Sequence, residues 1–216
     1  MVDSMLAQFL NVALDIQQTP AYAGIRVTGG TLAASDGVIL VAFKLNSEYI
    51  RGEGMIPPAT ARALAALANE VYLEHIAVDG TAVSLVTREQ YADSSERLTV
   101  SFPPFVCRLL RIESFLPRCL PPDATLLCEA PSLKFVKTLR SSEFVELVDA
   151  PKRGSELFQR KMPNAKVWYS VRQLREGLRL FRARDAVSVF RNEQGWLSFR
   201  DDWGRLFAVT PFVKRD

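Results

Sequence analysis

Apolar residues recur along the first half of the chain with two different periods. Between Ser4 and Leu14 they return every three or four residues, which predicts an amphipathic helix. A second helix is predicted over Ala59–Ala68, because Pro57 and Pro58 suit a first helical turn and the alanines favour helix. Short alternating runs predict antiparallel strands at 22–27, 31–34, 38–45, 72–78, 82–87 and 97–102.

The second half of the chain repeats this order. Helices are predicted over 132–141 and 171–181, and strands over 144–148, 167–169, 186–191, 195–199 and 205–210. Aligning the helix at 63–67 with that at 174–178 places Ile76 and Val78 opposite Val187 and Val189, at an offset of about 111 residues. A repeat of this length indicates duplication of a whole domain rather than a solenoid.

A proline-rich segment, 103–131, separates the two copies and predicts the crossing between domains. The pattern therefore predicts an α+β fold with two domains, 1–120 and 121–216, each with two helices packed on antiparallel sheet. The apolar run 31–43 is interrupted by Ser35-Asp36-Gly37, and this Asp-Gly pair predicts a tight hairpin turn.

Composition places the chain among ordinary globular proteins, since 48% of its residues are hydrophobic and 24% charged. No apolar run approaches the roughly 20 residues of a membrane span, and no basic segment precedes an apolar one at the N-terminus, so we expect a cytoplasmic protein without a membrane partner. The cysteines, Cys107, Cys119 and Cys128, form no CxxC pair and are predicted to be buried, reduced thiols.

Charge is distributed unevenly between the two halves. Residues 1–123 carry nine Lys and Arg against thirteen Asp and Glu, a balance of −4, whereas residues 124–216 carry eighteen against eleven, a balance of +7. A basic half next to a mildly acidic one points to an anionic partner that meets mainly the second half, although a solvated helix face rich in arginine gives the same count.

The basic residues of the second half gather on its two predicted helices. One helix carries Arg172, Arg175, Arg179 and Arg182 at spacings of three, four and three, roughly opposite the apolar Leu174, Leu178 and Phe181; the other carries Lys134, Lys137 and Arg140. Such rows are suited to phosphate contacts without base reading, which are independent of sequence and sensitive to salt. The first domain has no comparable row.

Catalytic signals are missing from the sequence. His75 is the single histidine and lies in an apolar run, where a structural role is expected. No carboxylate pair, metal-ligand spacing, nucleophile elbow or phosphate-binding glycine loop stands out, and Gly29-Gly30 and Gly52-Glu53-Gly54 are interpreted as turns. We therefore predict a protein that is not an enzyme and uses no metal or cofactor.

Four stretches resemble a known family when they are taken together in order. They are GIRVTGGTLAASDGVIL (24–40), MIPPATARALAAL (55–67), FPPF (102–105) and LFAVTPFV (206–213). Through them, residues 16–118 resemble the middle domain of the bacterial DNA polymerase III beta subunit, the sliding clamp, and residues 166–213 resemble the end of its last domain. Val38-Ile39 replaces the usual His-Arg of the family, and Thr210-Pro211-Phe212 replaces Met-Pro-Met.

The resemblance implies the DNA clamp fold and a function as a polymerase processivity factor. Clamps close a ring of six such domains around duplex DNA, so two domains imply a homotrimer. Both basic rows are on helices in the position that lines a clamp's hole, so the resemblance implies that they contact the DNA. A chain this compact suggests a phage or mobile-element replisome. The family tethers polymerases and its clamp loader through short peptides held in a groove; here the matching residues are Ser35, Gly37, Val38, Ile39, Leu40, Val209, Thr210, Pro211 and Phe212. Between Ser142 and Asn164 the second domain is short of strand sequence for this topology.

Two other functions stay open at this point. The acidic first domain is compatible with a clamp-derived adaptor that binds a partner protein without encircling DNA. A basic single-strand binder is the third possibility, with Trp168, Trp196 and Trp203 stacking on bases.

Overall fold

The computed structural model describes residues 2–17, 24–88, 97–102, 124–182 and 185–214. The chain divides into two compact units, one made of Met1–Gly37 and Val41–Ile112 and the other of Val38–Leu40 and Glu113–Asp216. The domain boundary predicted at residue 120 lies outside the described residues. Each unit has its own core and is described by itself.

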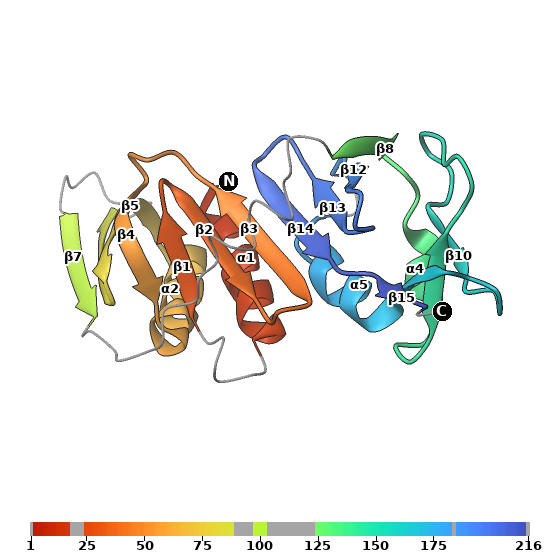
Figure 1. Ribbon diagram of the computed structural model, residues 1–216. Helices are drawn as coiled ribbons and strands as arrows, with labels where there is room; N and C mark the ends of the chain where they lie inside the picture. The colour runs from red at the N-terminus through yellow and green to blue at the C-terminus, as the bar shows by residue number, and fades with distance from the viewer. Residues whose placement is uncertain (1, 18–23, 89–96, 103–123, 183–184, 215–216) are drawn as a thin grey trace. The chain divides into compact units, whose positions relative to one another are not determined.

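The first unit is a sheet with two helices. Its strands lie in the order β7-β6-β5-β4-β1-β2-β3. They span β1 (Ile25–Thr28), β2 (Thr31–Ser35), β3 (Ile39–Lys44), β4 (Ile50–Ile56), β5 (Tyr72–Gly80), β6 (Ala82–Arg88) and β7 (Arg97–Phe102). Helices α1 (Val2–Ile16) and α2 (Pro58–Glu70) contact each other and lie behind this sheet in the view of Figure 1.

Both helices of the first unit confirm the sequence prediction. Helix α1 buries Leu6, Phe9 and Leu10 completely and exposes Asn11 and Asp15 on its other side, as its period requires. Helix α2 begins with proline in its first turn and buries a narrow face that includes Ala61, Leu64 and Ala68. The small alanine side chains let the two helices approach closely.

The interpretation of Gly52-Glu53-Gly54 as a turn is wrong, because these residues lie inside β4. Strand β4 runs parallel to β5, with Gly52 opposite Val78 and Gly54 opposite Gly80. A Cβ atom at either glycine would lie 2.0 Å from the carbonyl oxygen of its partner, and Gly52 has a φ of +82°. The glycines are therefore required by the close approach of the two backbones. Because glycine interrupts the alternation of apolar and polar residues, the sequence pattern did not predict this strand.

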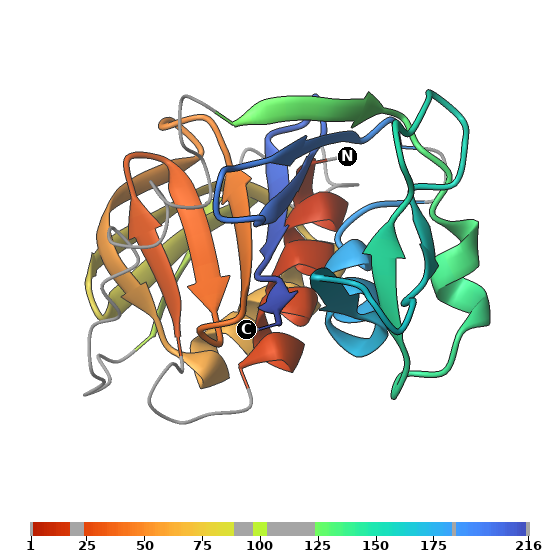
Figure 2. The same cartoon turned by 45° about the vertical axis from the view of Figure 1, so that its right-hand side comes forward.

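The second unit contains two small sheets. Strands β8 (Thr125–Glu129), β12 (Ser188–Arg191), β13 (Leu197–Arg200) and β14 (Arg205–Val209) form one, in the order β14-β13-β12-β8. Strands β9 (Phe144–Leu147), β10 (Phe158–Arg160), β11 (Val167–Ser170) and β15 (Phe212–Val213) form the other, in the order β10-β9-β11-β15. Two helices, α4 (Lys134–Thr138) and α5 (Val171–Leu178), complete the unit, and Figure 2 shows them in green and light blue.

The predicted repeat has a structural counterpart. In the first unit α2 is followed by the antiparallel strands β5, β6 and β7, and in the second unit α5 is followed by β12, β13 and β14 in the same antiparallel sequence. The aligned pairs Ile76 and Val187, and Val78 and Val189, are all buried. The two copies differ ahead of the helix, since β4 joins the sheet of the first unit whereas β11 belongs to the separate small sheet of the second.

Two expectations for the second unit need correction. The helix predicted over 132–141 is reduced to the five residues of α4, because Leu133 and Leu139 on either side leave the helical conformation. The segment from Ser142 to Asn164, which looked short of strand, contains both β9 and β10, paired antiparallel. Strand β10 has only three residues, too few for an alternating pattern to be recognised.

A buried hydrogen bond fixes the start of α1 to the loop before β4. The Tyr49 hydroxyl donates to Oδ1 of Asp3 at 2.5 Å, and the Asp3 residue is only 7% exposed. Burial, together with this carboxylate, raises the pKa of Tyr49 well above its ordinary value. The phenol therefore remains a donor at neutral pH.

We expect Tyr49→Phe to lower the free energy of unfolding by about 1–3 kcal/mol, because the Asp3 carboxylate is left buried without this donor. Urea denaturation measures the change. Tyr72→Phe is the matched control, since Tyr72 is 49% exposed and its loss of a hydroxyl should leave stability nearly unchanged. Equal effects of the two substitutions would contradict this account.

Candidate nucleic-acid interface

Helix α5 is held so that one side is buried and the other faces outward. The Ser170 hydroxyl caps its first turn by accepting from the Gln173 backbone N–H, while Leu174 and Leu178 are buried. Gly177 lies against Phe207 of β14, and a Cβ atom there would lie 2.0 Å from the phenylalanine ring. This close packing leaves Arg172, Arg175 and Arg179 exposed.

A buried arginine sets where α5 ends. Arg205 of β14 is 1% exposed, and its Nη1 donates to the carbonyl of Leu180 at 2.8 Å. Its Nε donates to Asp201 at 2.7 Å and its Nη2 to Asp185 at 2.5 Å, so the guanidinium is fully enclosed by acceptors. The carbonyl of Leu180 is thus committed to a tertiary partner rather than to a further helical turn.

The predicted row of four arginines on one helix is therefore only partly correct. Helix α5 stops at Leu178 instead of Phe181, and Arg182 lies beyond it, half-buried. The backbone N–H of Arg182 donates to Asp185 at 2.6 Å, on the same carboxylate oxygen that accepts from Arg205. Asp185 is only three residues after Arg182, but it is held in place by the distant Arg205, and this tertiary contact overrides the helical period here.

The remaining six predicted DNA-contacting residues are exposed on the touching helices α4 and α5 or within two residues of their ends. Arg175 donates from Nη1 to the carbonyl of Leu139 at 3.3 Å, which joins α5 to the end of α4. We call the exposed set the cationic face: Lys134, Lys137, Arg140, Arg172, Arg175 and Arg179. The structure thus brings both predicted basic rows into one region of the second unit.

Two carboxylates offset part of this charge. Arg172 forms an ion pair with Glu176 at 2.8 Å, at the i, i+4 spacing within α5. Glu143 accepts from the backbone N–H of Arg140 and lies 3.5 Å from Arg160. Sequence reasoning passed over Glu176, although its spacing from Arg172 was a usable signal. The cationic face keeps an excess of positive charge, since six basic residues face these two carboxylates.

The residues predicted to line a peptide groove divide by burial. Ile39 and Leu40 are 1% exposed and Val209 is fully buried, so these side chains fill the core. In the second unit Val38 lies beside Thr210, whose backbone N–H donates to the Val38 carbonyl at 3.0 Å. Val38, Thr210 and Pro211 are half-buried, and Phe212 is 40% exposed.

The predicted hairpin turn before Val38 is confirmed. Ser35 ends β2 with its side chain buried, and its Oγ accepts from the backbone N–H of Gly37 at 3.0 Å. Gly37 has a φ of +94°, which glycine adopts without strain. Both residues belong to the first unit.

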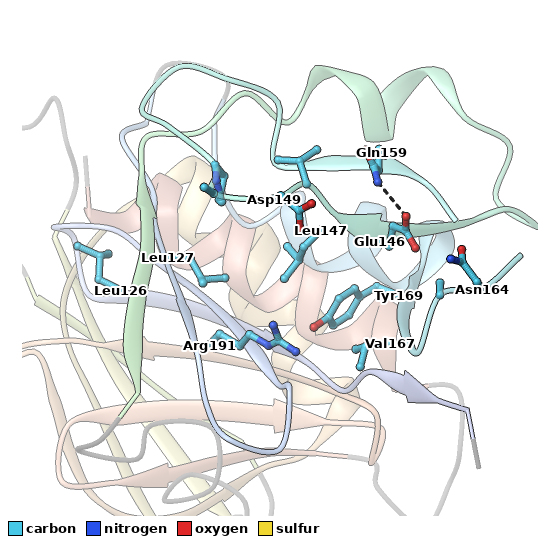
Figure 3. Close-up of a pocket in the computed structure, with 14 residues that line it drawn as sticks. Leu126, Leu127, Glu146, Leu147, Asp149, Gln159, Asn164, Val167, Tyr169 and Arg191 are labelled. Carbon is cyan, nitrogen blue, oxygen red and sulfur yellow. Dashed lines mark hydrogen bonds between the residues drawn. The ribbon is translucent and has the colours of Figure 1, made fainter. Parts of the chain in front are cut away.

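A cavity of about 550 Å³ lies wholly within the second unit, between β8, β9 and β11. Figure 3 shows the Arg191 guanidinium and the Tyr169 hydroxyl pointing toward one another within it. Burial raises the pKa of Tyr169 to about 12, and the neutral phenol donates to the Gly195 carbonyl at 2.6 Å. Glu146 accepts from Gln159 at 2.8 Å. The described lining residues include neither histidine nor cysteine.

Other candidates from the sequence have ordinary surroundings. His75 is half-buried on β5, and no cluster of metal-ligating side chains occurs among the residues described. Cys128 is a buried free thiol, as predicted, whereas Cys107 and Cys119 lie outside the described residues. Trp196 and Trp203 flank opposite ends of β13, so the three tryptophans do not form one continuous track.

Solved structures match this architecture over nearly the whole chain. A protein described as a DNA polymerase III beta subunit from Eubacterium rectale matches with a TM-score of 0.58 and 10% identity, over 97% of this chain and 64% of that one. The DNA polymerase sliding clamp from Bacillus subtilis matches with a TM-score of 0.59 and 12% identity, over 99% of this chain and 63% of that one. The chain has the fold of DNA sliding clamps.

Sequence comparison adds nothing to this likeness, since no protein-family model and no curated protein matches the chain. The expected clamp fold is therefore confirmed by structure alone, and the chain spans about 63–64% of the length of the two clamps it matches. Within the described part of this clamp fold, no helix is long and apolar enough to cross a membrane.

We expect Arg205→Leu to destabilise the second unit by about 3–5 kcal/mol, because Asp185 and Asp201 are left buried without their cation. Differential scanning calorimetry measures the loss. Arg160→Leu provides the comparison, since its pair with Glu143 is exposed and should contribute less than about 1 kcal/mol. A stable Arg205→Leu protein would show that the network does not hold the end of α5.

Proposed function

We propose that this protein is a clamp-like DNA polymerase processivity factor that binds duplex DNA through the cationic face. The observation that carries the proposal is the exposure of six basic side chains on, or directly after, the two touching helices α4 and α5 within a clamp fold. Flexible cations on helices meet phosphates at any sequence, and such contacts permit sliding. A catalytic role is not part of the proposal.

The proposed assembly is a ring of three copies that encloses duplex DNA. Each chain supplies two units, and both contain the arrangement of a helix followed by three antiparallel strands. Polymerase and clamp loader would attach through short peptides along the segment from Val209 to Phe212 and the neighbouring Val38. The exposed Phe212 ring supplies an apolar anchor of the kind that short peptides need.

A clamp-derived adaptor remains the second candidate because the first unit does not share the cationic face. Helix α1 exposes Ser4, Asn11 and Asp15, and Arg62 is the single basic residue of α2. An adaptor would bind a partner protein without encircling DNA, so charge reversal on the cationic face would leave its binding unchanged. The two functions therefore make opposite predictions for charge reversal.

We expect the double variant Arg175→Glu, Arg179→Glu to bind a 30-base-pair duplex at least about tenfold more weakly, with a shallower dependence on salt, because two phosphate contacts are lost. Fluorescence anisotropy at several salt concentrations measures both. Since Arg175 also contacts Leu139, the variant Lys134→Glu, Lys137→Glu tests the face without that contact. Arg51→Glu, an exposed residue on β4, is the control and should change little. Unchanged binding by both double variants favours the adaptor.

We expect light scattering with size exclusion to give a mass of about 73 kDa at micromolar concentration, three times the 24.2 kDa of the chain. A closed ring shields its edge strands, so three copies are the smallest complete assembly of six units. A strict monomer under these conditions would rule out an autonomous ring.

A further inference from the structure

A cation lies where the core of the second unit opens into the cavity between β8, β9 and β11. Arg191 follows Val189 by two residues on β12, so both side chains lie on the same face of that strand. Val189 is fully buried, whereas Arg191 is half-buried and lines the cavity. The Arg191 guanidinium points into the cavity, toward the Tyr169 hydroxyl (Figure 3). Arg191 therefore occupies a position at which an apolar side chain would extend the core.

The Arg191 guanidinium has no acceptor among the described residues. The carbonyl of Arg191 accepts from the Thr125 hydroxyl at 3.2 Å, a bond that uses none of the guanidinium donors. The Tyr169 hydroxyl gives its hydrogen to the Gly195 carbonyl at 2.6 Å, so the phenol has no hydrogen left for a ligand. Arg205 of the same unit, in contrast, is paired with two carboxylates. The donors of Arg191 are thus available to an anion that the described part of the chain does not supply.

Apolar side chains form the wall of the cavity next to this cation. Leu126 and Leu127 both line it, although neighbouring residues of a regular strand face opposite sides. The reason is a β-bulge, since β12 pairs with Cys128 and then directly with Leu126, which leaves Leu127 as the extra residue of β8. Leu147 of β9 and Val167 of β11 also line the cavity. The bulge thus adds one more leucine to an apolar wall.

Carboxylates lie on the side of the cavity away from Arg191. Glu146 of β9 and Asp149 in the turn after it are lining residues, whereas Arg191 belongs to β12 (Figure 3). The Glu146 carboxylate accepts from Gln159 at 2.8 Å, and Asp149 is exposed. A second anionic group on a ligand would be repelled by these carboxylates. The lining is therefore suited to a molecule with a single negative charge.

We propose that the cavity binds a small organic molecule with one anionic group and an apolar body, such as a medium-chain carboxylate. The anionic group binds Arg191, and the apolar body lies against Leu127, Leu147 and Val167. The cavity volume of about 550 Å³ is within the range of roughly 300–1,000 Å³ that is usual for small-molecule sites. The proposal is independent of the cationic face and of ring formation.

Three ligands with the same chain length test the proposal by isothermal titration calorimetry: octanoate, octanamide and octanedioate. We expect octanoate to bind at least about tenfold more tightly than octanamide, because only the carboxylate makes charge-assisted hydrogen bonds with Arg191. Octanedioate should bind more weakly than octanoate, since its second carboxylate meets Glu146 and Asp149. No binding of octanoate, or equal binding of octanoate and octanamide, would overturn the proposal.

Arg191→Gln should remove the preference for octanoate over octanamide, because the cation is lost and the apolar wall stays. Arg191→Lys keeps the charge and should retain part of the preference. Arg51→Gln is the matched control, since Arg51 is an exposed arginine of the first unit, and it should change nothing. Circular dichroism verifies that each variant is folded. A preference that survives Arg191→Gln, or that Arg51→Gln lowers equally, would show that octanoate binds elsewhere on the surface.

Leu127→Ala separates the apolar contribution from the charge. It keeps Arg191 and removes part of the wall, so octanoate and octanamide should both lose roughly threefold or more in affinity while their ratio stays the same. Unchanged affinities for both ligands would contradict the proposed position of the apolar body. Arg191→Gln should leave affinity for the 30-base-pair duplex within a factor of two, because α4 and α5 are unaltered. Failure of duplex binding in the wild type would contradict the processivity function without affecting the calorimetric result, so the two proposals fail separately.

Discussion

The second unit depends on the enclosure of one guanidinium group. Arg205 is buried among Asp185, Asp201 and the Leu180 carbonyl, so a single side chain joins the β13–β14 turn to the end of α5 and to the segment before β12. Burying two carboxylates and one cation carries a large desolvation free energy unless hydrogen bonds between them compensate for it. Here the bonds are made from both sides, since the Arg205 backbone N–H also donates to Asp201 at 2.9 Å. The geometry of this turn is consequently tightly specified.

The network controls the cationic face indirectly. By ending α5 after Leu178, it removes Arg182 from the helix and leaves Arg172, Arg175 and Arg179 on the exposed side. A contrasting arginine lies on the neighbouring strand. The Arg200 side chain rests on the Phe190 ring at 4.4 Å, and its buried Nε and Nη2 have no hydrogen-bond partner among the described residues. Burial lowers the pKa of Arg200. One arginine thus specifies the fold through hydrogen bonds, while the other packs mainly as a flat apolar group.

The periodic sequence pattern correctly predicted the features that depend on local interactions. The sequences of α1 and α2 alone define their buried faces, and the spacing of Arg172, Arg175 and Arg179 predicted their common exposure. The predictions failed where contacts with residues distant in the sequence determine the structure. Strand β4 is specified by glycines that let β5 approach, and the end of α5 by an arginine some 25 residues away. The contacts of Phe212 with Phe144 and Trp168 join three strands, β9, β11 and β15, so no local pattern predicted them.

The two units share one arrangement of helix and strands but differ in surface chemistry. Helix α5 exposes Arg172 and Arg175, whereas its aligned counterpart α2 has Arg62 as its single basic residue. A ring of three such chains would alternate cationic with nearly neutral sectors, and duplex DNA inside it would meet phosphate contacts on only half of the wall. Affinity for DNA rises steeply with the number of phosphate contacts. Halving that number would therefore weaken binding and make it easier for the ring to move along the duplex.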